Sequence, residues 1–414
     1  MDHEPRKVII AADAPDAVRE ICGISVLERL LRILQRLDCT AVTILSSTPE
    51  QISEHLAPPS APRAGVQVSV RAVAPGGLKI SDVSGFRGAV AVIAVGYYDS
   101  RLVGALLKRP QTTLLIDSAP TLPQLMTSAA AAAVLEHAWL TRAAADVPLF
   151  AQLTRAAERN QIALLDAAAQ PTYVTSMRRS IRPVWFPSPA PENVTLAERV
   201  LLHAAQNGTL DLPAIVHGPI ETWIIARLCR TPITPNQITL FTAVVSASVT
   251  ALFASGKLAT GTLLALLVGV LDGLDGKQAR VKVETTPLGQ REHALDYVLE
   301  LSWWTALAFR FGAYPWLALL VSSDLIDRLA KKHAKQKTGR NLDDVAPIDR
   351  FVRLIGGRRN IYIWIFAAGL LLHAPGKAFI TLCGWGALTA AVHVCRAVWI
   401  SRQRRGVRGE GASH

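Results

Sequence analysis

Cysteine is scarce in this sequence, and the spacings that would give it a metal-binding or cross-linking role are missing. The 414 residues include five cysteines, and no two of them form a CxxC pair or another paired spacing. The sequence therefore predicts neither a zinc site nor a disulfide framework. A reducing environment facing the cytoplasm is the simplest expectation for such a chain.

The first residues also lack the long apolar core of a secretory signal peptide. The apolar run from Val8 to Ala12 is short, and an acidic residue, Asp13, follows it directly. Signal peptides need a longer apolar segment than this, so we expect no cleaved leader.

Aromatic residues are few among the basic ones, which argues against a nucleic-acid partner. The formal net charge is +12, whereas aromatic residues make up 6% of the chain. Nucleic-acid sites usually combine basic stripes with aromatic side chains. Here the basic residues gather in blocks at the ends of apolar runs, at 331–359 and 402–408. This placement is typical of the cytoplasmic loops of membrane proteins, so we expect membrane lipids as partners and no nucleic acid.

The first half of the chain has the pattern of an α/β domain. Short apolar runs alternate with amphipathic segments, and this alternation favours an open, mostly parallel sheet. The segments expected as strands are 7–12, 41–45, 66–73, 89–95 and 113–116. Apolar residues at steps of three and four predict a helix over 24–37, and a closing helix is expected from Pro191 to Gly208.

The second half is expected to be an all-α bundle of six transmembrane helices. Its apolar runs approach the length that crosses about 30 Å of hydrocarbon. They lie at 238–253, 260–274, 294–311, 316–329, 361–372 and 378–400. An even number of spans places both chain ends and the intervening basic block in the cytoplasm. We expect a multi-pass protein of a plasma or inner membrane, divided into a cytoplasmic domain, an interfacial linker helix, a membrane domain and a disordered tail at 1–210, 211–237, 238–405 and 406–414.

Acidic residues inside or beside the apolar runs indicate a functional site. An ionisable group at membrane depth is costly unless it is paired or faces a polar cavity. Spacings of three and four place two carboxylates on each of two helical faces. Carboxylates facing one another repel unless cations lie between them, and hard oxygen ligands favour Mg²⁺ or Mn²⁺. The acids are Asp272, Asp275, Glu292 and Asp296.

Small and basic residues accompany these acids. Gly276 permits close backbone approach to a ligand, and Ala279 is also small. Arg280 can bind a phosphate through two parallel hydrogen bonds. The same stretch therefore has residues that suit a phosphorylated ligand.

The stretch resembles the CDP-alcohol phosphatidyltransferase signature, D-x2-D-G-x2-A-R-x8-G-x3-D-x3-D. The residues that match in type and spacing are Asp272, Asp275, Gly276, Ala279, Arg280 and Gly289, and the segment ITPNQIT before the first apolar run is also typical of the family. Strict counting from Gly289 places the last two acids at His293 and Tyr297. If one residue is deleted after Gly289, Glu292 and Asp296 take those positions instead. Both registers remain open, with His293 a ligand in the strict one.

The resemblance implies a reaction and a role for each residue. Two divalent cations held by the first three acids, with Asp296 beside them, would clamp the diphosphate of a CDP-alcohol. Asp296 would act as general base on an acceptor hydroxyl, and CMP would leave. Gly276, Ala279 and Arg280 would hold the donor, while Asn236 either contacts the nucleotide or caps the first span. By analogy with the family we expect a homodimer.

The first half resembles the sugar-phosphate nucleotidyltransferases. The resemblance rests on a strand and a loop that are followed by a leucine-rich helix and a second strand, within CGISVLERLLRILQRLDCTAVTIL. It also rests on Asp99, the acid that ends the segment AVGYYD, roughly where that family has a metal-binding acid at the end of a strand. However, AADAPDAVREICG stands where that family has a glycine-rich loop that cradles a nucleotide triphosphate, and the lysine before the helix is missing. We therefore expect the fold without nucleotidyl transfer, with Asp13, Asp16 and Asp99 as ordinary loop acids.

The fusion of these halves resembles bifunctional inositol-phosphate cytidylyltransferase/di-inositol-phosphate-phosphate synthases. It implies a transferase of phospholipid or inositol-phosphate-type synthesis whose donor another enzyme supplies. A donor of the CDP-diacylglycerol type is one alternative. An alternative of another class is a non-catalytic membrane scaffold whose soluble domain binds a nucleotide or a partner.

Further charged residues near the apolar runs have two interpretations each. Arg358 and Arg359 would hold an acceptor phosphate or anchor the fifth span. Asp324 and Asp327 would pair with Arg328 and Lys331 or extend the polar cavity, and Glu300 lies one turn beyond Asp296.

Overall fold

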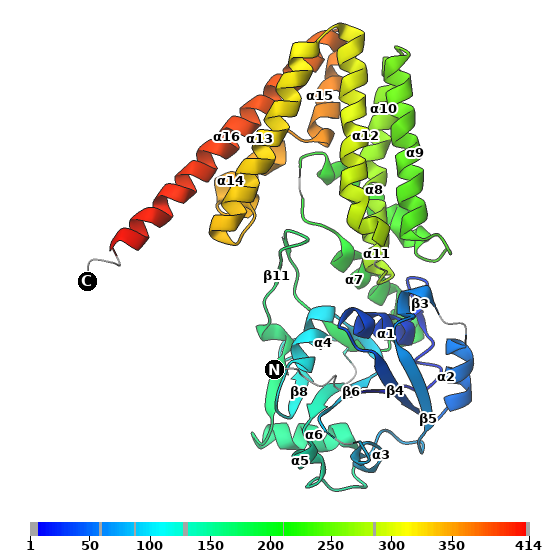
Figure 1. Ribbon diagram of the computed structural model, residues 1–414. Coiled ribbons are helices and arrows are strands. Elements are labelled where there is room, and N and C mark those ends of the chain that lie inside the picture. Colours follow the sequence, from blue (N-terminus) through cyan, green and yellow to red (C-terminus); the bar gives the residue numbers. More distant parts are fainter. Residues whose placement is uncertain are drawn as a thin grey trace. The chain divides into compact units, whose positions relative to one another are not determined.

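The chain folds into two compact units in the computed structural model (Figure 1). The structure describes residues 7–57, 60–86, 88–126, 131–209, 211–284 and 287–410, without the side chains of 287–293 and 403–410. The first unit is Met1–Ala205 with two later pieces, Leu228–Pro232 and Ala279–Thr285. The second unit is Gln206–Arg227, Ile233–Gln278 and Thr286–His414.

A seven-stranded, mostly parallel sheet forms the centre of the first unit. Its strand order is β10-β8-β9-β6-β1-β4-β5, and only β9 runs antiparallel to its two neighbours. The strands are β1 (Lys7–Ala11), β4 (Ala41–Ser46), β5 (Gln67–Ala72), β6 (Val90–Ala94), β8 (Thr113–Ile116), β9 (Ala132–Leu135) and β10 (Ala163–Asp166). The five predicted strands are confirmed, whereas β9 and β10 were not predicted.

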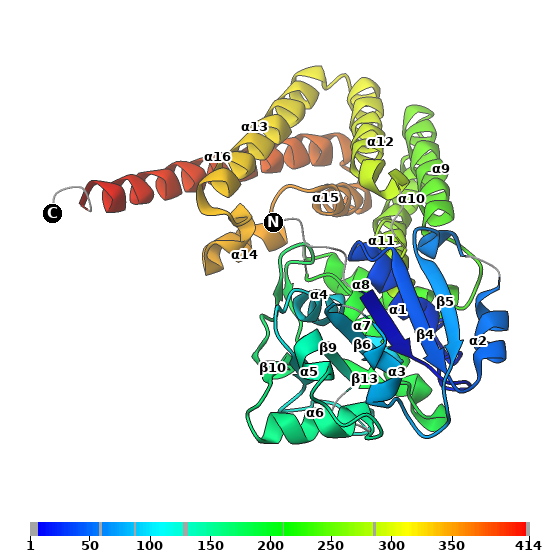
Figure 2. The ribbon, with the colours of Figure 1, turned by 60° about the horizontal axis from the view of Figure 1, so that its bottom comes forward.

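Helices cover both faces of this sheet because side chains alternate along each strand. Val8 and Ile10 pack in one core with the leucines of α1 (Val26–Arg36) and with α2 (Pro49–Leu56) and α4 (Ser100–Leu107). Ile9 points to the other core, with α3 (Ile80–Ser84), α5 (His137–Leu140) and α6 (Leu149–Glu158). The strands accordingly lie between α1 and α6 in both views (Figure 1, Figure 2).

Short hairpins and one more helix complete the first unit. The two-stranded pairs are β2 (Glu20–Ile21) with β3 (Ile24–Ser25), β7 (Gly96–Tyr98) with β13 (Trp185–Pro187), and β11 (Tyr173–Val174) with β12 (Arg179–Ser180). The predicted closing helix is α7 (Val194–Ala205).

The second unit is helical, and every predicted apolar run is helical over most of its length. Its helices are α8 (Ala214–Leu228), α9 (Pro235–Ala254), α10 (Leu258–Leu271), α11 (Leu274–Val281), α12 (Pro287–Phe311), α13 (Tyr314–Thr338), α14 (Pro347–Ile355), α15 (Arg359–Leu371) and α16 (Pro375–Glu410). Helix α9 lies beside α10 and α12, and α13 runs along α16 (Figure 1). The predicted tail at 406–414 overlaps α16 as far as Glu410, and 411–414 lie outside the described residues.

Three stretches of the second unit are long and apolar enough to cross a membrane: Pro235–Ala254, Leu258–Val281 and Pro375–Arg402. The shorter α15 is also apolar. Many large apolar side chains of these helices are exposed, including Leu240, Phe241 and Leu263. Such exposure is unusual for a water-soluble surface and indicates a membrane protein. The predicted linker is α8, where Trp223 is 60% exposed.

Candidate active site

The first two motif acids lie on either side of the break between α10 and α11. Asp272 is the residue that caps the end of α10, and Asp275 lies in the first turn of α11. Between them, a Cβ atom on Gly273 would lie 2.5 Å from an oxygen of Glu221. The carboxylate of Glu221 in α8 therefore lies directly against the backbone of the motif.

Asp275 is buried and held by two hydrogen bonds. Its side chain accepts a hydrogen bond of 2.7 Å from the Thr239 hydroxyl of α9 and another of 2.6 Å from the Gly276 backbone N–H. The residue is only 4% exposed. Buried carboxylates are oriented by such partners, so Thr239 fixes the direction of the Asp275 side chain.

Asp272 forms an ion pair with the first residue of α15. Its Oδ2 atom lies 2.6 Å from Nη2 of Arg359, whose side chain is 14% exposed. The sequence predicts that Arg359 either holds an acceptor phosphate or anchors the fifth span. The structure places its guanidinium directly at the motif.

Asp296 of α12 lies close enough to the first acid pair for their charges to interact. The carboxylates of Asp272 and Asp275 both act on Asp296, and so does the guanidinium of Arg359. Asp296 is therefore within electrostatic range of Asp272 and Asp275 in the second unit. The side chains of Glu292 and His293 lie outside the described residues. Among the side chains that the structure does describe, no three acids, histidines or cysteines are close enough together to hold a metal ion.

A buried lysine in the motif was missed by the sequence analysis. Lys277 is 1% exposed, and its Nζ atom donates to the Thr222 hydroxyl at 2.6 Å and to the Gln206 side chain. Glu221 lies 4.0 Å from the same Nζ atom. These contacts fasten α11 to α8, and no local spacing in the sequence pairs them.

Asn236 lies at the beginning of α9 and does not cap it. The cap is Thr234, whose hydroxyl accepts from the Gln237 backbone N–H while the Gln237 side chain accepts from the Thr234 backbone N–H. Of the two predicted roles for Asn236, contact with the nucleotide stays a prediction.

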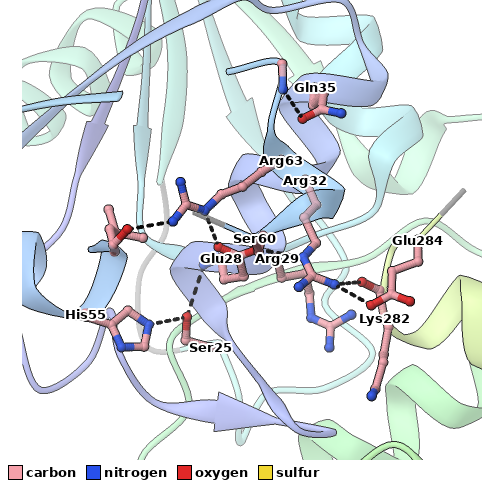
Figure 3. Close-up of polar contacts among 12 residues, drawn as sticks. Ser25, Glu28, Arg29, Arg32, Gln35, His55, Ser60, Arg63, Lys282 and Glu284 are labelled. Carbon is pink, nitrogen blue, oxygen red and sulfur yellow. Dashed lines mark hydrogen bonds and ion pairs between the residues drawn. The ribbon is translucent and has the colours of Figure 1, made fainter. Parts of the chain in front are cut away.

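The end of the motif belongs to the first unit. Arg280 donates from Nε to the backbone oxygen of Ala205 at 2.7 Å. Two arginines of α1 hold the residues that follow it (Figure 3). Arg29 donates to the Val281 backbone oxygen, and Arg32 donates to the Lys282 backbone oxygen at 2.8 Å and to Glu284 at 3.0 Å.

Arg32 is also part of a buried network of charges. It lies 2.8 Å from Glu28, which accepts a further hydrogen bond of 2.7 Å from Arg63. The side chains of Arg32, Glu28 and Arg63 are 7%, 12% and 7% exposed. Burial alone would raise the pKa of Glu28, but hydrogen bonds from Ser60 and Arg32 and the two arginine charges hold it below its ordinary value. We call Arg29, Arg32 and their partners in Ala279–Thr285 the loop clamp.

The predicted ion pairs on α13 are confirmed. Asp324 lies 2.8 Å from Arg328, and Asp327 lies 2.7 Å from Lys331. Arg358 pairs with Asp343 at 2.9 Å.

The acids of the first unit are engaged in local structure. Asp13 accepts hydrogen bonds from the Ser47 backbone and from the Ser46 and Ser47 hydroxyls. Asp99 caps α4 and binds the Arg101 guanidinium. A cavity of about 190 Å³ at the carboxyl ends of β1, β4 and β6 includes Asp13 and Asp16 in its lining. This edge is where open α/β sheets bind ligands.

The family model described as CDP-alcohol phosphatidyltransferase matches residues 232–392. This range contains the acids Asp272, Asp275 and Asp296, together with Thr239 and Arg359. Residues 232–392, less than half of the chain, are therefore similar to the CDP-alcohol phosphatidyltransferase family.

Three individual proteins are similar to parts of the chain. Over 226 residues the chain is 30% identical to the "Bifunctional IPC transferase and DIPP synthase" of Rubrobacter xylanophilus. The aligned stretch covers 53% of this chain and 49% of that protein. The chain thus spans about half the length of the curated relative. It also resembles the structure of phosphatidylinositol phosphate synthase from Mycobacterium tuberculosis with CDP-DAG bound (TM-score 0.34, 20% identity, 44% of this chain and 94% of that one). A further resemblance is to a putative glucose-1-phosphate thymidylyltransferase from Bacillus anthracis (TM-score 0.35, 12% identity, 47% and 94%).

Proposed function

We propose that the CDP-alcohol phosphatidyltransferase domain moves a substituted phosphate group from a CDP-alcohol to an acceptor hydroxyl and releases CMP. The reaction belongs to phospholipid or inositol-phosphate-type synthesis. The observation that carries this proposal is the family match over residues 232–392, which contain Asp272, Asp275 and Asp296, and the charges of the first two act on the third. Acids brought together at membrane depth are unfavourable unless a site uses them.

We propose that two divalent cations, Mg²⁺ or Mn²⁺, bind at Asp272, Asp275, Glu292 and Asp296. The donor atoms are carboxylate oxygens, which these hard cations prefer. A basic group, Arg359, already lies against Asp272, which agrees with a site that attracts positive charge. When bound, such cations neutralise negative charge on the diphosphate and on the transferred group.

The protein's own residues would orient the substrates and move the proton. Asp296 accepts the proton of the acceptor hydroxyl while the oxygen of that hydroxyl forms a bond to the donor phosphorus. The bond between this phosphorus and the oxygen that leaves with CMP breaks. Gly276 and Ala279 leave room for the donor. Asn236 and Arg280 contribute polar contacts to it. The charges of Asp272 and Asp275 act on Asp296, which supports the register in which Glu292 and Asp296 are the third and fourth motif acids.

The same proposal includes the membrane arrangement. Six helices cross the membrane, with the first unit and the acids on the cytoplasmic side, and two copies form a homodimer. The three long apolar stretches support insertion in a membrane, the basic block at 331–359 supports the cytoplasmic side, and the six spans and the homodimer rest on the sequence pattern and on analogy with the family.

A panel of labelled donors tests the proposed reaction. Purified membranes receive CDP-diacylglycerol or a CDP-polyol, with candidate acceptors and Mg²⁺ or Mn²⁺. We expect CMP from one donor class, and none when EDTA replaces the cation. Absence of CMP with every donor would favour the non-catalytic scaffold.

Arg359 provides a more specific prediction. Arg359→Met removes a charge-assisted contact at the site, so we expect kcat/KM to fall by about 30- to 1000-fold. Arg358→Met is the matched control, because the neighbouring arginine pairs with the buried Asp343 and with no motif acid; it should lower stability, while kcat/KM of the folded protein stays within about threefold of the wild type. Equal effects of the two variants would contradict a role of Arg359 at the site.

We further propose that the first unit does not transfer nucleotides. Asp13 accepts hydrogen bonds from Ser46 and Ser47, Asp99 caps α4, and the glycine-rich loop is missing. Incubation of the protein with CTP, Mg²⁺ and a sugar or polyol phosphate is expected to release no pyrophosphate above a protein-free control. Enzyme-dependent pyrophosphate release would contradict this assignment.

A further inference from the structure

The first unit contains a cavity of about 530 Å³ that is separate from the edge where parallel strands end. Its lining comes from α1, from β7 and the start of α4, from the connection between β11 and β12, from α7, and from residues 280–283. None of the residues that line the strand-edge cavity, such as Ala11, Asp13 and Leu45, is shared with it. The volume lies within the range of small-molecule sites, about 300–1,000 Å³.

The charges that line this cavity are mostly positive. Among the described residues, four arginines and one acid, Asp99, line it. That acid is already neutralised, because Arg101 donates to both of its carboxylate oxygens, at 3.0 and 2.8 Å. The remaining arginines are Arg29, Arg36 and Arg280.

Arg29 is a buried positive charge in the lining of this cavity. It is 2% exposed and donates to two backbone oxygens, of Val281 and Ile21. Its Nε atom has no hydrogen-bond partner within the described part of the chain, and no described acid pairs with it. Burial lowers the pKa of Arg29. A buried cation without a counter-charge is costly, and an anion in the cavity would offset that cost.

Arg36 adds a second positive charge from the same helix face. Arg29, Ile33 and Arg36 follow one another at steps of four and three along α1, and all three line the cavity. The charge of Glu284 acts on Arg36, but the carboxylate of Glu284 is bound by Arg32 in the loop clamp. Arg36 can therefore turn to a ligand without breaking an ion pair among the described residues.

The rest of the lining suits an organic molecule more than a bare ion. Tyr97, Ser100 and Ser176 add hydroxyl groups. Apolar side chains complete it: Ile33, Val174, Met177 and Ile181. Arginine groups recognise phosphate geometry, while apolar and aromatic walls hold the remainder of a ligand.

We propose that this cavity binds a small phosphate monoester, with the phosphate between Arg29 and Arg36 and the organic part against Ile33 and Met177. A nucleoside monophosphate and a polyol phosphate share this chemistry, and both fit the size. None of the motif acids that the structure describes lines the cavity, although the motif residue Arg280 does, so this binding does not require the divalent cations of the transferase reaction.

Equilibrium dialysis on the full-length protein in detergent tests the proposal. The probes are labelled CMP and labelled glycerol 3-phosphate, and unlabelled inorganic phosphate is the competitor. EDTA is present throughout, so that binding that depends on divalent cations does not contribute. We expect saturable binding of one of the two labelled probes, and its displacement by inorganic phosphate.

Two variants connect binding to this cavity. Arg36→Glu is expected to weaken binding at least tenfold, because it places a negative charge beside the phosphate. Arg199→Glu makes the same change at an exposed residue of α7 outside the lining, and should change Kd less than twofold. Ile33→Trp fills the cavity without a change of charge and should also weaken binding at least tenfold. Circular dichroism establishes that each variant is folded.

Two results would overturn the proposal. One is the absence of saturable binding of both probes to the wild type at millimolar concentration. The other is binding that Arg36→Glu and Ile33→Trp leave unchanged. Preferential binding of CMP would identify the ligand as a nucleoside monophosphate, and preferential binding of glycerol 3-phosphate would identify it as a polyol phosphate.

Discussion

Asp296→Asn is expected to lower the rate of CMP release by about 10²- to 10⁴-fold, the usual contribution of a general base. Asparagine keeps the size of the side chain and its hydrogen-bonding capacity, but it cannot take the proton of the acceptor hydroxyl. It also removes one carboxylate from the group formed with Asp272 and Asp275. The measurement is the initial rate of CMP formation from the accepted donor at saturating acceptor.

The matched control for this variant is Asp324→Asn. Asp324 lies on a neighbouring helix, where its partner is Arg328, and its side chain is 33% exposed. Exposed pairs of this kind contribute little, so CMP release should remain within about threefold of the wild type. Undiminished release by Asp296→Asn would remove this residue from the mechanism. Equal losses in the two variants would show that the change acts through folding.

Arg32→Met is expected to destabilise the first unit by about 3–5 kcal/mol, because breaking a buried ion pair leaves the partner charges unpaired. Glu284 would lose its bond to Arg32, and Glu28 would keep only Arg63 and Ser60. The loop clamp would lose one of its two arginines. The measurement is the denaturant midpoint of the first unit in the full-length protein, followed through buried Trp185.

Arg32→Lys and Lys108→Met are informative companions to this variant. Lysine keeps the charge but not the planar group that bonds Glu28, Glu284 and the Lys282 backbone together, so an intermediate loss is expected. Lys108→Met removes an exposed charge of α4 and should cost less than about 0.5 kcal/mol. A loss below 1 kcal/mol for Arg32→Met would contradict the energetic role assigned to the clamp.

The effect of Arg32→Met should depend on pH in a definite direction. The folded state holds the pKa of Glu28 below its ordinary value of 4.5. A group with a lowered folded pKa contributes full stability above its unfolded pKa, and that contribution is lost as pH falls through the folded pKa. The difference in stability between wild type and Arg32→Met should therefore be largest near neutral pH and shrink below about pH 4.5.

The elements of both units could be predicted because their patterns are local. The strand from Lys7 to Ala11 is a short continuous apolar run, and the helix from Val26 to Arg36 repeats apolar residues with a period near 3.6; the structure contains both. The motif acids could be chosen because an acid in an apolar run is costly wherever the chain folds. These inferences require no knowledge of which helices are neighbours.

The contacts of the site could not be predicted, because they join residues that are far apart in the chain. Thr239 lies on α9 and Arg359 begins α15, and nothing near either residue indicates a carboxylate partner. Nothing in the sequence distinguishes Lys277 from the other basic residues, whereas the structure shows that it is buried among Thr222, Gln206 and Glu221. For the loop clamp there was a weak signal, since Arg29 and Arg32 interrupt an apolar helix.

The most direct test of the central claim follows both products of one reaction. The donor carries one label on the cytidine and another on the alcohol, and the acceptor is unlabelled. The account predicts that wild-type protein forms CMP and the new phosphodiester in equal amounts, and that Asp275→Asn forms neither above background. CMP formed without the phosphodiester, or equal activity in Asp275→Asn, would contradict it.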